Sequence, residues 1–518
     1  MEQSETNLYT GDITYDRTPL FWAAESGHEE VVKILLERSD VNMEAVDEYG
    51  ITPLCVAAQN GHEGVVRALV ERSGASLNIA DDVYGRTPLA WAADIGHIEV
   101  VAILLELNDV DPNVPDTFGG TPLSLAVENG HEEVVAMLIQ RNDVNPNTTD
   151  DKDKTPLCWA AENGYEGIVR ILVEQSAAEI NRADTMSGQT PLSWAAKEGH
   201  SGVVRFLLKL NGIDPDLADD CGRTPLRMAA FGGHEATVKM LLERNDVNPE
   251  LADIHKETPL SVAALIGHEG VVRMLLERND VNPNTACTSG QTPLSHAARW
   301  GHERVVRRLL ERKDIDPSMA DTEFGRTPLL WAAWNTHSGI VRILLERNDV
   351  NPETADRSGQ TPLCWAALNG DEVIVRLLLE PGGVDPDMAG EKGQTPLFQA
   401  AKKRNGGVMK ILLGRCDVDP NTAREDGQTP LSWAARKENE DVVRMLLERN
   451  DLNLDTTDNS GRTPASLAAE NMHDGIAKLL RDRTDSASRY AARLQQAVPR
   501  SPELPEISEP PSKRIRRS

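Results

Sequence analysis

Cysteine is scarce in this sequence and shows no metal-binding or disulfide pattern. The six cysteines lie far apart, and no two of them form a CxxC pair; they are Cys55, Cys158, Cys221, Cys287, Cys364 and Cys416. Neither a zinc site nor a disulfide framework is therefore expected. We accordingly predict no metal site and no cofactor.

The sequence also lacks a long hydrophobic run. No 18 consecutive residues are apolar, so we expect no transmembrane helix. The first residues, Met1 to Asp16, are acidic and polar, which is unlike a secretory or transit peptide. These features are typical of a soluble intracellular protein.

Basic residues are outnumbered by acidic ones. There are 54 Lys and Arg against 82 Asp and Glu, which gives a formal net charge of −28. Such a surface repels DNA, RNA and anionic membranes. We therefore expect neither direct DNA binding nor membrane binding.

The sequence does contain a repeat, which organises almost all of it. The dipeptide Thr-Pro recurs with spacings of 34 or 35 residues, beginning at Thr18, Thr52, Thr87, Thr121, Thr155, Thr190, Thr224, Thr258, Thr292, Thr327, Thr361, Thr395, Thr429 and Thr463. A fixed period of this length indicates stacked structural units rather than several independent domains. We number these units repeat 1 to repeat 14.

Each repeat reads as two short helices and a loop. In repeat 6, Thr190 is a suitable N-cap and Pro191 suits the first helical position. Gly199 suits the end of that helix, where a left-handed residue is wanted. A second helix follows, with an apolar face formed by Val203, Val204, Leu207 and Leu208. A glycine two residues before most Thr-Pro pairs marks a tight turn.

The repeated pattern T-P-L-x-x-A-A followed by G-H resembles the ankyrin repeat, whose core reads T-P-L-H-x-A. The resemblance implies an all-α repeat solenoid of about 14 repeats. It differs from the family pattern in that Ser, Cys or Phe usually follows T-P-L, and Trp is frequent at the next position. These departures resemble the ankyrin arrays of filamentous fungi.

The period also sets the domain boundaries that we predict. Residues 1–13 form a short polar segment, and residues 14–482 form the repeat array. A C-terminal capping helix is expected over 483–498, because repeat 14 is atypical and its second helix is polar. Residues 499–518 form a Pro-rich disordered tail with a basic end.

Enzyme signatures are missing from the sequence. It contains no P-loop, GxGxxG, GxSxG or kinase motif set. Only about 15 residues precede the array and about 35 follow it, too few for a catalytic domain. We expect no catalytic residue and no small-molecule substrate.

Most histidines and tryptophans keep a fixed place in the repeat. Ten of the twelve histidines lie ten residues after a Thr-Pro threonine, which predicts a repeated turn hydrogen bond rather than metal or acid–base chemistry. Seven of the nine tryptophans lie four residues after the threonine, next to the Ala-Ala pair, which favours a core role. Cys55, Cys158 and Cys364 are predicted to be small packing residues.

In the ankyrin family, the end of each first helix and the preceding turn line a concave groove. Here the end of the first helix corresponds to the two residues after Ala-Ala, which we call the first and second groove positions. They change from acidic through apolar to basic along the chain. We predict that they bind a protein partner, with a contiguous exposed apolar stripe. The predicted binding residues are Phe231, Leu265, Ile266, Arg299, Trp300, Trp334, Leu368, Lys402, Lys403, Arg436 and Lys437.

An alternative interpretation is that the apolar members contact the adjacent repeat. A second candidate surface is the row of turn tips with aromatic residues, at Tyr15, Tyr49, Tyr84, Phe118 and Phe324. These rings either contact a partner or pack against one another.

The last residues carry a basic cluster on an otherwise acidic protein. Lys513, Arg514, Arg516 and Arg517 lie within five residues and resemble a nuclear import signal. The expected partner of this cluster is an importin. The alternatives are a solvated basic end and one that folds back onto the acidic array.

Two hypotheses for function follow. The first is a nuclear adaptor or transcription coregulator that holds a protein partner in its groove, comparable to ankyrin-only fungal coregulators of secondary-metabolite gene clusters. The second is a cytoplasmic scaffold or recognition arm, related to the ankyrin arrays of fungal NACHT-type receptors. The two hypotheses differ in the expected location of the protein, so the effect of deleting the basic tail on nuclear accumulation distinguishes them.

Overall fold

A computed structural model describes residues 15–72, 76–380 and 384–497, with side chains up to residue 485. These residues form 28 α-helices and a single 3-10 turn, Glu391–Gly393, and they contain no strand. The predicted all-α repeat solenoid is therefore confirmed. The chain divides into two units, Met1–Glu323 with repeats 1 to 9 and Phe324–Ser518 with repeats 10 to 14.

Every repeat contributes two helices, and the first of each pair begins at the proline of Thr-Pro. In unit 1 the first helices are α1 (Pro19–Glu25), α3 (Pro53–Gln59), α5 (Pro88–Ile95), α7 (Pro122–Glu128), α9 (Pro156–Glu162), α11 (Pro191–Glu198), α13 (Pro225–Gly232), α15 (Pro259–Ile266) and α17 (Pro293–Trp300). The second helices of unit 1 are α2 (Glu29–Leu36), α4 (Glu63–Glu71), α6 (Ile98–Leu105), α8 (Glu132–Ile139), α10 (Glu166–Gln175), α12 (Ser201–Leu207), α14 (Glu235–Leu242), α16 (Glu269–Leu276) and α18 (Glu303–Leu310).

Unit 2 repeats the same plan. Its first helices are α19 (Pro328–Trp334), α21 (Pro362–Asn369), α23 (Pro396–Lys403), α25 (Pro430–Arg436) and α27 (Pro464–Glu470). Its second helices are α20 (Ser338–Leu345), α22 (Glu372–Leu379), α24 (Gly406–Leu413), α26 (Glu440–Leu447) and α28 (Asp474–Ala497).

The threonine hydroxyl fixes where each first helix begins. In repeat 6, Thr190 Oγ1 accepts a hydrogen bond from the backbone N–H of Ser193 at 3.1 Å, and Pro191 occupies the first helical position. The hydroxyl satisfies an amide that has no partner within the helix, and proline leaves no other amide unsatisfied there. The helix ends at Gly199, whose φ of +78° lies in the left-handed region as predicted.

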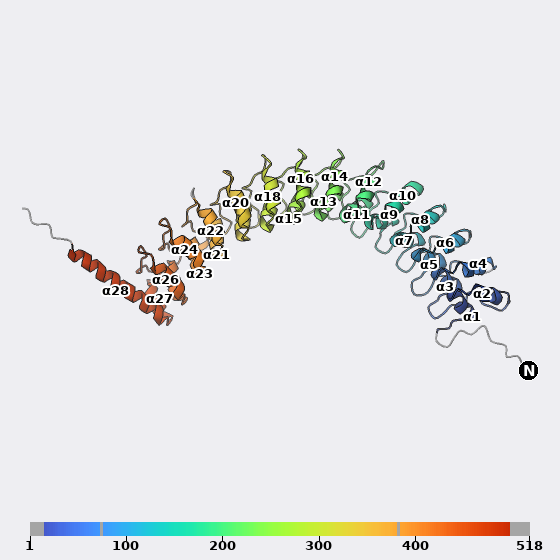
Figure 1. Ribbon diagram of the computed structural model, residues 1–518, viewed down its shortest axis with the longest axis horizontal. Helices are drawn as coiled ribbons and strands as arrows, with labels where there is room; N and C mark the ends of the chain where they lie inside the picture. The colour runs from blue at the N-terminus through green and yellow to red at the C-terminus, as the bar shows by residue number, and fades with distance from the viewer. Residues whose placement is uncertain (1–14, 73–75, 381–383, 498–518) are drawn as a thin grey trace, which may run out of the picture. The chain divides into compact units, whose positions relative to one another are not determined.

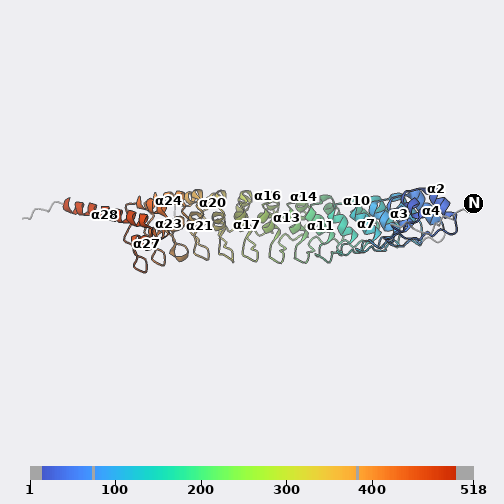
Figure 2. The ribbon, with the colours of Figure 1, turned by 90° about the horizontal axis from the view of Figure 1, so that it is seen from below.

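Neighbouring repeats pack helix on helix in two layers within each unit. The first helix of each repeat contacts the first helices of its neighbours, as α11 does with α9 and α13, and the second helices do the same (Figure 1). The Ala-Ala pairs are buried at these contacts, so the helices approach closely. The turns that precede the first helices project from the stack as a row of loops (Figure 2).

The histidines join consecutive repeats, as the sequence pattern predicts. His234 Nε2 lies 2.9 Å from the backbone carbonyl oxygen of Lys197 in the preceding repeat, and His62 Nε2 lies 2.9 Å from that of Glu25. Each histidine also begins a second helix. Because a neutral imidazole with its proton on Nε2 donates one hydrogen bond to such an oxygen, these residues are part of the scaffold.

Four tryptophans of the repeat pattern, Trp91, Trp159, Trp194 and Trp365, are tied to the preceding turn by their indole nitrogens. Trp194 Nε1 donates to Asp184 at 2.9 Å, and Trp365 Nε1 donates to Asp356 at 2.9 Å. The other oxygen of Asp356 accepts from backbone amides of its own turn, including Gln360 N–H. One carboxylate therefore closes the turn and holds the ring, which gives the core role of the tryptophans its physical basis.

The structure corrects two details of the sequence analysis. Trp22 is 44% exposed rather than buried, because repeat 1 has no preceding repeat in the described chain to cover its ring. The capping helix expected over 483–498 is not a separate helix: α28 runs without a break from Asp474 to Ala497. Beyond Gly475 in its first turn, no glycine or proline interrupts α28, so the second helix of repeat 14 simply continues.

Candidate partner-binding surfaces

The ends of the first helices and the turns before them form one surface in each unit, which we call the first-helix face. The second groove position faces outward, as Ile266 and Trp300 do. The first groove position leans toward the turn of its own repeat and is half-buried in Leu265, Arg299, Trp334 and Leu368. The first groove position is not half-buried in every repeat, because Phe231, Lys402 and Arg436, which also occupy it, are exposed.

Unit 1 carries an apolar patch made of Phe231, Ile266 and Trp300. Their side chains are 53%, 42% and 56% exposed, respectively. They lie at the ends of α13, α15 and α17, which are consecutive and in contact. The three side chains are thus exposed on three adjacent repeats, Phe231 at the first groove position and Ile266 and Trp300 at the second.

Two predicted binding residues support this patch rather than extend it. Arg299 lies with its guanidinium 5.6 Å from the centre of the Trp300 ring, and its Nη1 donates to Gln291 at 3.4 Å. Leu265 is half-buried, and its carbonyl oxygen lies 3.0 Å from His302 Nε2. Arg299 is therefore placed to orient the indole, while Leu265 belongs to the packing between repeats.

Trp334 and Leu368, predicted as exposed members of the stripe, are half-buried in unit 2. The Trp334 ring packs edge-on against Trp331 at 5.4 Å and Trp365 at 6.2 Å. The Arg326 guanidinium lies over it at 4.4 Å. Other repeats place an acidic residue at this position opposite the same cation, as Asp94 does with Arg86 at 2.7 Å. Trp334 replaces that ion pair with a cation–π contact, so the expectation that it is an exposed anchor is wrong.

The predicted basic residues form a basic patch in unit 2. Lys402, Lys403, Arg436 and Lys437 are all exposed and lie at the ends of the contacting helices α23 and α25. Within the described part of the chain none of the four makes an ion pair; Lys402 donates only to the Gln394 side chain, at 3.4 Å. Four uncompensated cations on neighbouring repeats favour an anionic partner surface.

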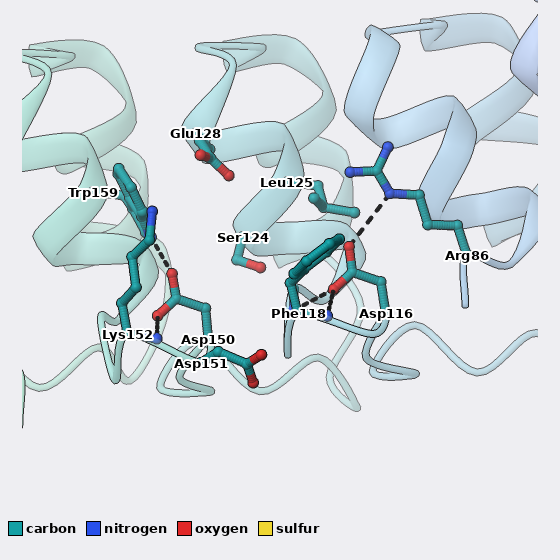
Figure 3. A pocket seen from close by; sticks show the side chains of 11 residues that line it. Arg86, Asp116, Phe118, Ser124, Leu125, Glu128, Asp150, Asp151, Lys152 and Trp159 are labelled. Atoms are coloured by element: carbon teal, nitrogen blue, oxygen red, sulfur yellow. Dashed lines mark hydrogen bonds and ion pairs between the residues drawn. The ribbon is translucent and has the colours of Figure 1, made fainter. Parts of the chain in front are cut away.

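A pocket of about 270 Å³ opens on the first-helix face of unit 1, between repeats 3 and 5 (Figure 3). Its walls combine aromatic and aliphatic groups with charges of both signs. The lining residues are Arg86, Asp116, Phe118, Gly120, Ser124, Leu125, Glu128, Asp150, Asp151, Lys152 and Trp159.

Two departures of repeat 4 from the repeat pattern create this pocket. Leu125 stands where repeats 3 and 5 have Trp91 and Trp159. Gly120 stands where those repeats have Arg86 and Lys154. In repeats 3 and 5 the tryptophan and the basic side chain occupy the equivalent space. In repeat 4 the smaller leucine and the glycine leave that space open.

The same departures leave Glu128 without its usual partner. In repeats 3 and 5 the corresponding acids, Asp94 and Glu162, form ion pairs with Arg86 and Lys154. Within the described residues Glu128 forms none, and its carboxylate lies at the rim of the pocket (Figure 3). Partial desolvation raises the pKa of Glu128 above its ordinary value of 4.5. This carboxylate is suited to accept a cation from outside the chain.

The aromatic turn tips are exposed, and their turns are connected through the backbone. The carbonyl oxygens of Tyr49 and Tyr84 accept hydrogen bonds from the Asp82 and Thr117 amides of the next turn, at 2.9 and 2.8 Å. The Phe118 ring is 59% exposed and lines the pocket. The turns thus stack on one another, and Phe118 is the tip residue that also lines a candidate binding surface.

Sequence reasoning missed the pocket because it depends on what repeat 4 lacks. Its signal is visible once repeats are aligned by Thr-Pro: Gly120 and Leu125 break two patterns in one repeat.

The predicted import residues Lys513, Arg514, Arg516 and Arg517 lie outside the described residues. Among the described helices, none combines the length and apolar composition that spanning a bilayer requires.

Comparison with known families agrees with this architecture. The family model described as ankyrin repeats in three copies matches overlapping segments at residues 3–81, 20–116, 73–150, 89–184, 141–219, 192–286, 242–321, 278–356, 313–390, 346–423 and 397–489. The chain belongs to the ankyrin-repeat family, and its repeats form a protein-interaction scaffold. A search of curated proteins finds no match.

Proposed function

We propose that this ankyrin-repeat protein is a non-catalytic nuclear adaptor or transcription coregulator that holds a protein partner on its first-helix face. The observation that carries the proposal is the apolar patch of Phe231, Ile266 and Trp300. The side chains of these three residues are exposed on three adjacent repeats. Large exposed apolar groups gathered in one place mark protein-binding sites, and tryptophan dominates binding hot spots.

The surrounding charges indicate the chemistry of the partner. The basic patch of unit 2 suits an acidic segment. The pocket of unit 1 suits a lysine or arginine side chain, whose methylene stem contacts Phe118 and Trp159 while its charge approaches Glu128. The partner is therefore expected to present an apolar segment together with separate acidic and basic ones.

The apolar patch is tested with the double variant Phe231→Ala, Trp300→Ala in the full chain. Partner capture, quantified by mass spectrometry of affinity-purified complexes, is expected to fall by at least about tenfold, since each hot-spot truncation costs about 2 kcal/mol or more. Ile34→Ala is the matched control, because Ile34 is an exposed apolar residue on the second helix α2. Equal losses in the double variant and the control would overturn the proposal.

The pocket is tested by restoring the repeat pattern with Gly120→Arg and Leu125→Trp. The arginine is expected to pair with Glu128 as Arg86 pairs with Asp94, and the indole to fill the cavity. Binding of the captured partner should weaken while the thermal transition of the protein stays equal or rises. Glu128→Gln removes the negative charge but keeps the size of the side chain, so it distinguishes the electrostatic from the steric contribution to binding. It should weaken binding of a basic partner segment and leave the cavity open.

The nuclear assignment is supported by the basic cluster at Lys513, Arg514, Arg516 and Arg517, through which an importin would bind. A fluorescent fusion that lacks residues 513–518 is expected to lose nuclear accumulation. If accumulation is unchanged, the tail is not an import signal. The alternative function, a cytoplasmic scaffold related to the arrays of fungal NACHT-type receptors, is favoured if the intact fusion stays in the cytoplasm.

A further inference from the structure

Repeat 9 replaces both partners of the tryptophan–aspartate pair that closes the turn in repeats 3, 5, 6 and 11. Cys287 stands in the turn where repeat 11 has Asp356, and His296 stands on α17 where repeat 11 has Trp365. In repeat 11 these two side chains are joined by a hydrogen bond of 2.9 Å. The two substitutions therefore fall on side chains that meet in space, and they exchange a carboxylate and an indole for a thiol and an imidazole.

A third unusual residue of the preceding repeat joins them. Glu257 occupies the position directly before Thr-Pro, where other repeats have arginine, lysine or glutamine in most cases. One ligand atom each of Glu257, Cys287 and His296 lies within 4.8 Å of the other two. Glu257 Oε1 is 3.3 Å from His296 Nε2. The three groups come from two consecutive repeats and converge on one point, which we call the Cys–His–Glu cluster.

The imidazole of this cluster is buried. His296 is 6% exposed, and among the described residues neither Nδ1 nor Nε2 has a hydrogen-bond partner. Cys287 is 7% exposed. A buried polar atom without a partner is costly, and native structures rarely keep one without a use. Both ring nitrogens of His296 are thus available to a ligand.

We propose that Glu257, Cys287 and His296 bind one Zn²⁺ ion that cross-links repeats 8 and 9. A thiolate, an imidazole and a carboxylate are the three ligand types that zinc takes in proteins, whereas Mg²⁺ and Ca²⁺ prefer oxygen ligands alone. Tetrahedral zinc holds such atoms about 3.4 to 3.6 Å apart, so small side-chain adjustments suffice. Water completes the fourth position.

Neighbouring hydroxyl groups are placed to orient two of the three ligands. Ser261 Oγ donates to Glu257 Oε2 at 2.5 Å, which leaves Oε1 for the metal. Ser289 Oγ lies 3.1 Å from Cys287 Sγ and is placed to donate to a thiolate. Such outer partners fix ligand orientation and are typical of zinc centres. Ser261→Ala is expected to weaken zinc binding by about tenfold.

The test uses the full chain, reduced and freed of metal with a chelator, and titrated with Zn²⁺ against a chromophoric competitor. One ion per chain is expected, and Co²⁺ as a spectroscopic probe should give a thiolate charge-transfer band and the visible bands of a tetrahedral site. Cys287→Ser should abolish the thiolate band and weaken zinc binding by about 100-fold or more. Cys158→Ser is the control, because Cys158 is buried in repeat 5, outside the cluster.

A second variant keeps the proposal falsifiable if Cys287→Ser misfolds. Cys287→Asp with His296→Trp restores the pair seen in Asp356 and Trp365, so it should fold and show no zinc-dependent rise in melting temperature. The intact protein should show such a rise. Equal zinc stoichiometry in the intact protein and this variant, or no binding by the intact protein at micromolar Zn²⁺, would overturn the proposal.

Discussion

Single side chains join each repeat to the one before it. The histidine that begins a second helix binds the backbone of the preceding repeat, and Asn405 takes over this role in repeat 12 by donating to the Leu368 carbonyl oxygen at 3.1 Å. At the end of several second helices, an arginine does the same, as Arg312 does with the Leu276 carbonyl oxygen at 3.0 Å. The acceptor is a backbone carbonyl oxygen, which is present whatever the side chain of the preceding repeat. The same hydrogen bond can therefore join successive repeats within a unit.

The histidine bridges give the first prediction. His234→Ala removes the hydrogen bond to the Lys197 carbonyl oxygen and leaves that oxygen without its partner. The free energy of unfolding is expected to fall by about 1 to 2 kcal/mol, as measured by chemical denaturation. His255→Ala is the control, since the side chain of His255 is exposed in a turn and outside the repeat register. Equal losses in both variants would contradict a bridging role.

The tryptophans give the second prediction, which contrasts a core ring with a surface ring. Trp331 is 1% exposed, whereas Trp300 is 56% exposed. Trp331→Ala is expected to destabilise unit 2 by about 3 to 5 kcal/mol. Trp300→Ala should change the free energy of unfolding by less than about 0.5 kcal/mol. Comparable destabilisation by both would mean that Trp300 is a packing residue and not a binding one.

The contacts of a side chain could be predicted from the sequence where the same contacting residues recur in every repeat. The bridging histidines and the Ala-Ala contacts follow from one repeat, because every neighbour presents the same atoms. Trp334 was mispredicted because its partner is Arg326, a residue that pairs with an acid in other repeats. The Cys–His–Glu cluster and the pocket combine unusual residues of adjacent repeats, so a search for local motifs does not detect them.

At the scale of the helix, the array uses elements too short to be stable alone. The first helices have seven or eight residues, below the length at which an isolated helix forms in water. Their stability comes from the threonine cap, the proline at the first position and the contacts with both neighbouring repeats. The cap pattern made the starts of these helices predictable. The continuity of α28 across residue 483 was not predicted, because the loss of the repeat period there does not coincide with a residue that stops a helix.

The cap gives the third prediction. Thr190→Val keeps the branched shape but removes the hydroxyl that accepts from the Ser193 amide. The opening free energy of α11, measured by amide hydrogen exchange, is expected to fall by about 1 kcal/mol. Thr190→Ser retains the hydroxyl and should preserve protection. Unchanged exchange in the valine variant would show that packing alone fixes the start of the helix.

Across the whole chain, acidic residues dominate, and many of them are held as ions by arginine. Repeated Arg-x-Asp pairs follow the second helices, and the neighbouring guanidinium lowers the aspartate pKa below its ordinary value of 3.8 in Asp143, Asp246, Asp280, Asp314, Asp349, Asp417 and Asp451. Desolvation has the opposite effect on the pKa of Glu128, Asp216, Glu250 and Asp387. The two groups therefore contribute to the pH dependence of stability with opposite signs.

These shifts give the fourth prediction. An aspartate whose pKa is lowered by folding stabilises the protein above pH 3.8, and this contribution is lost as the pH falls through the lowered pKa. The carboxyls whose pKa is raised by folding act in the opposite sense: as the pH falls they protonate before ordinary carboxyls do, and this protonation stabilises the folded protein. The melting temperature should thus change little between about pH 7 and 5 and fall steeply below about pH 4. In the variant Arg278→Gln, Arg312→Gln, which removes the partners of Asp280 and Asp314, the fall between pH 5 and 3 should be shallower; an identical fall would assign acid unfolding to other groups.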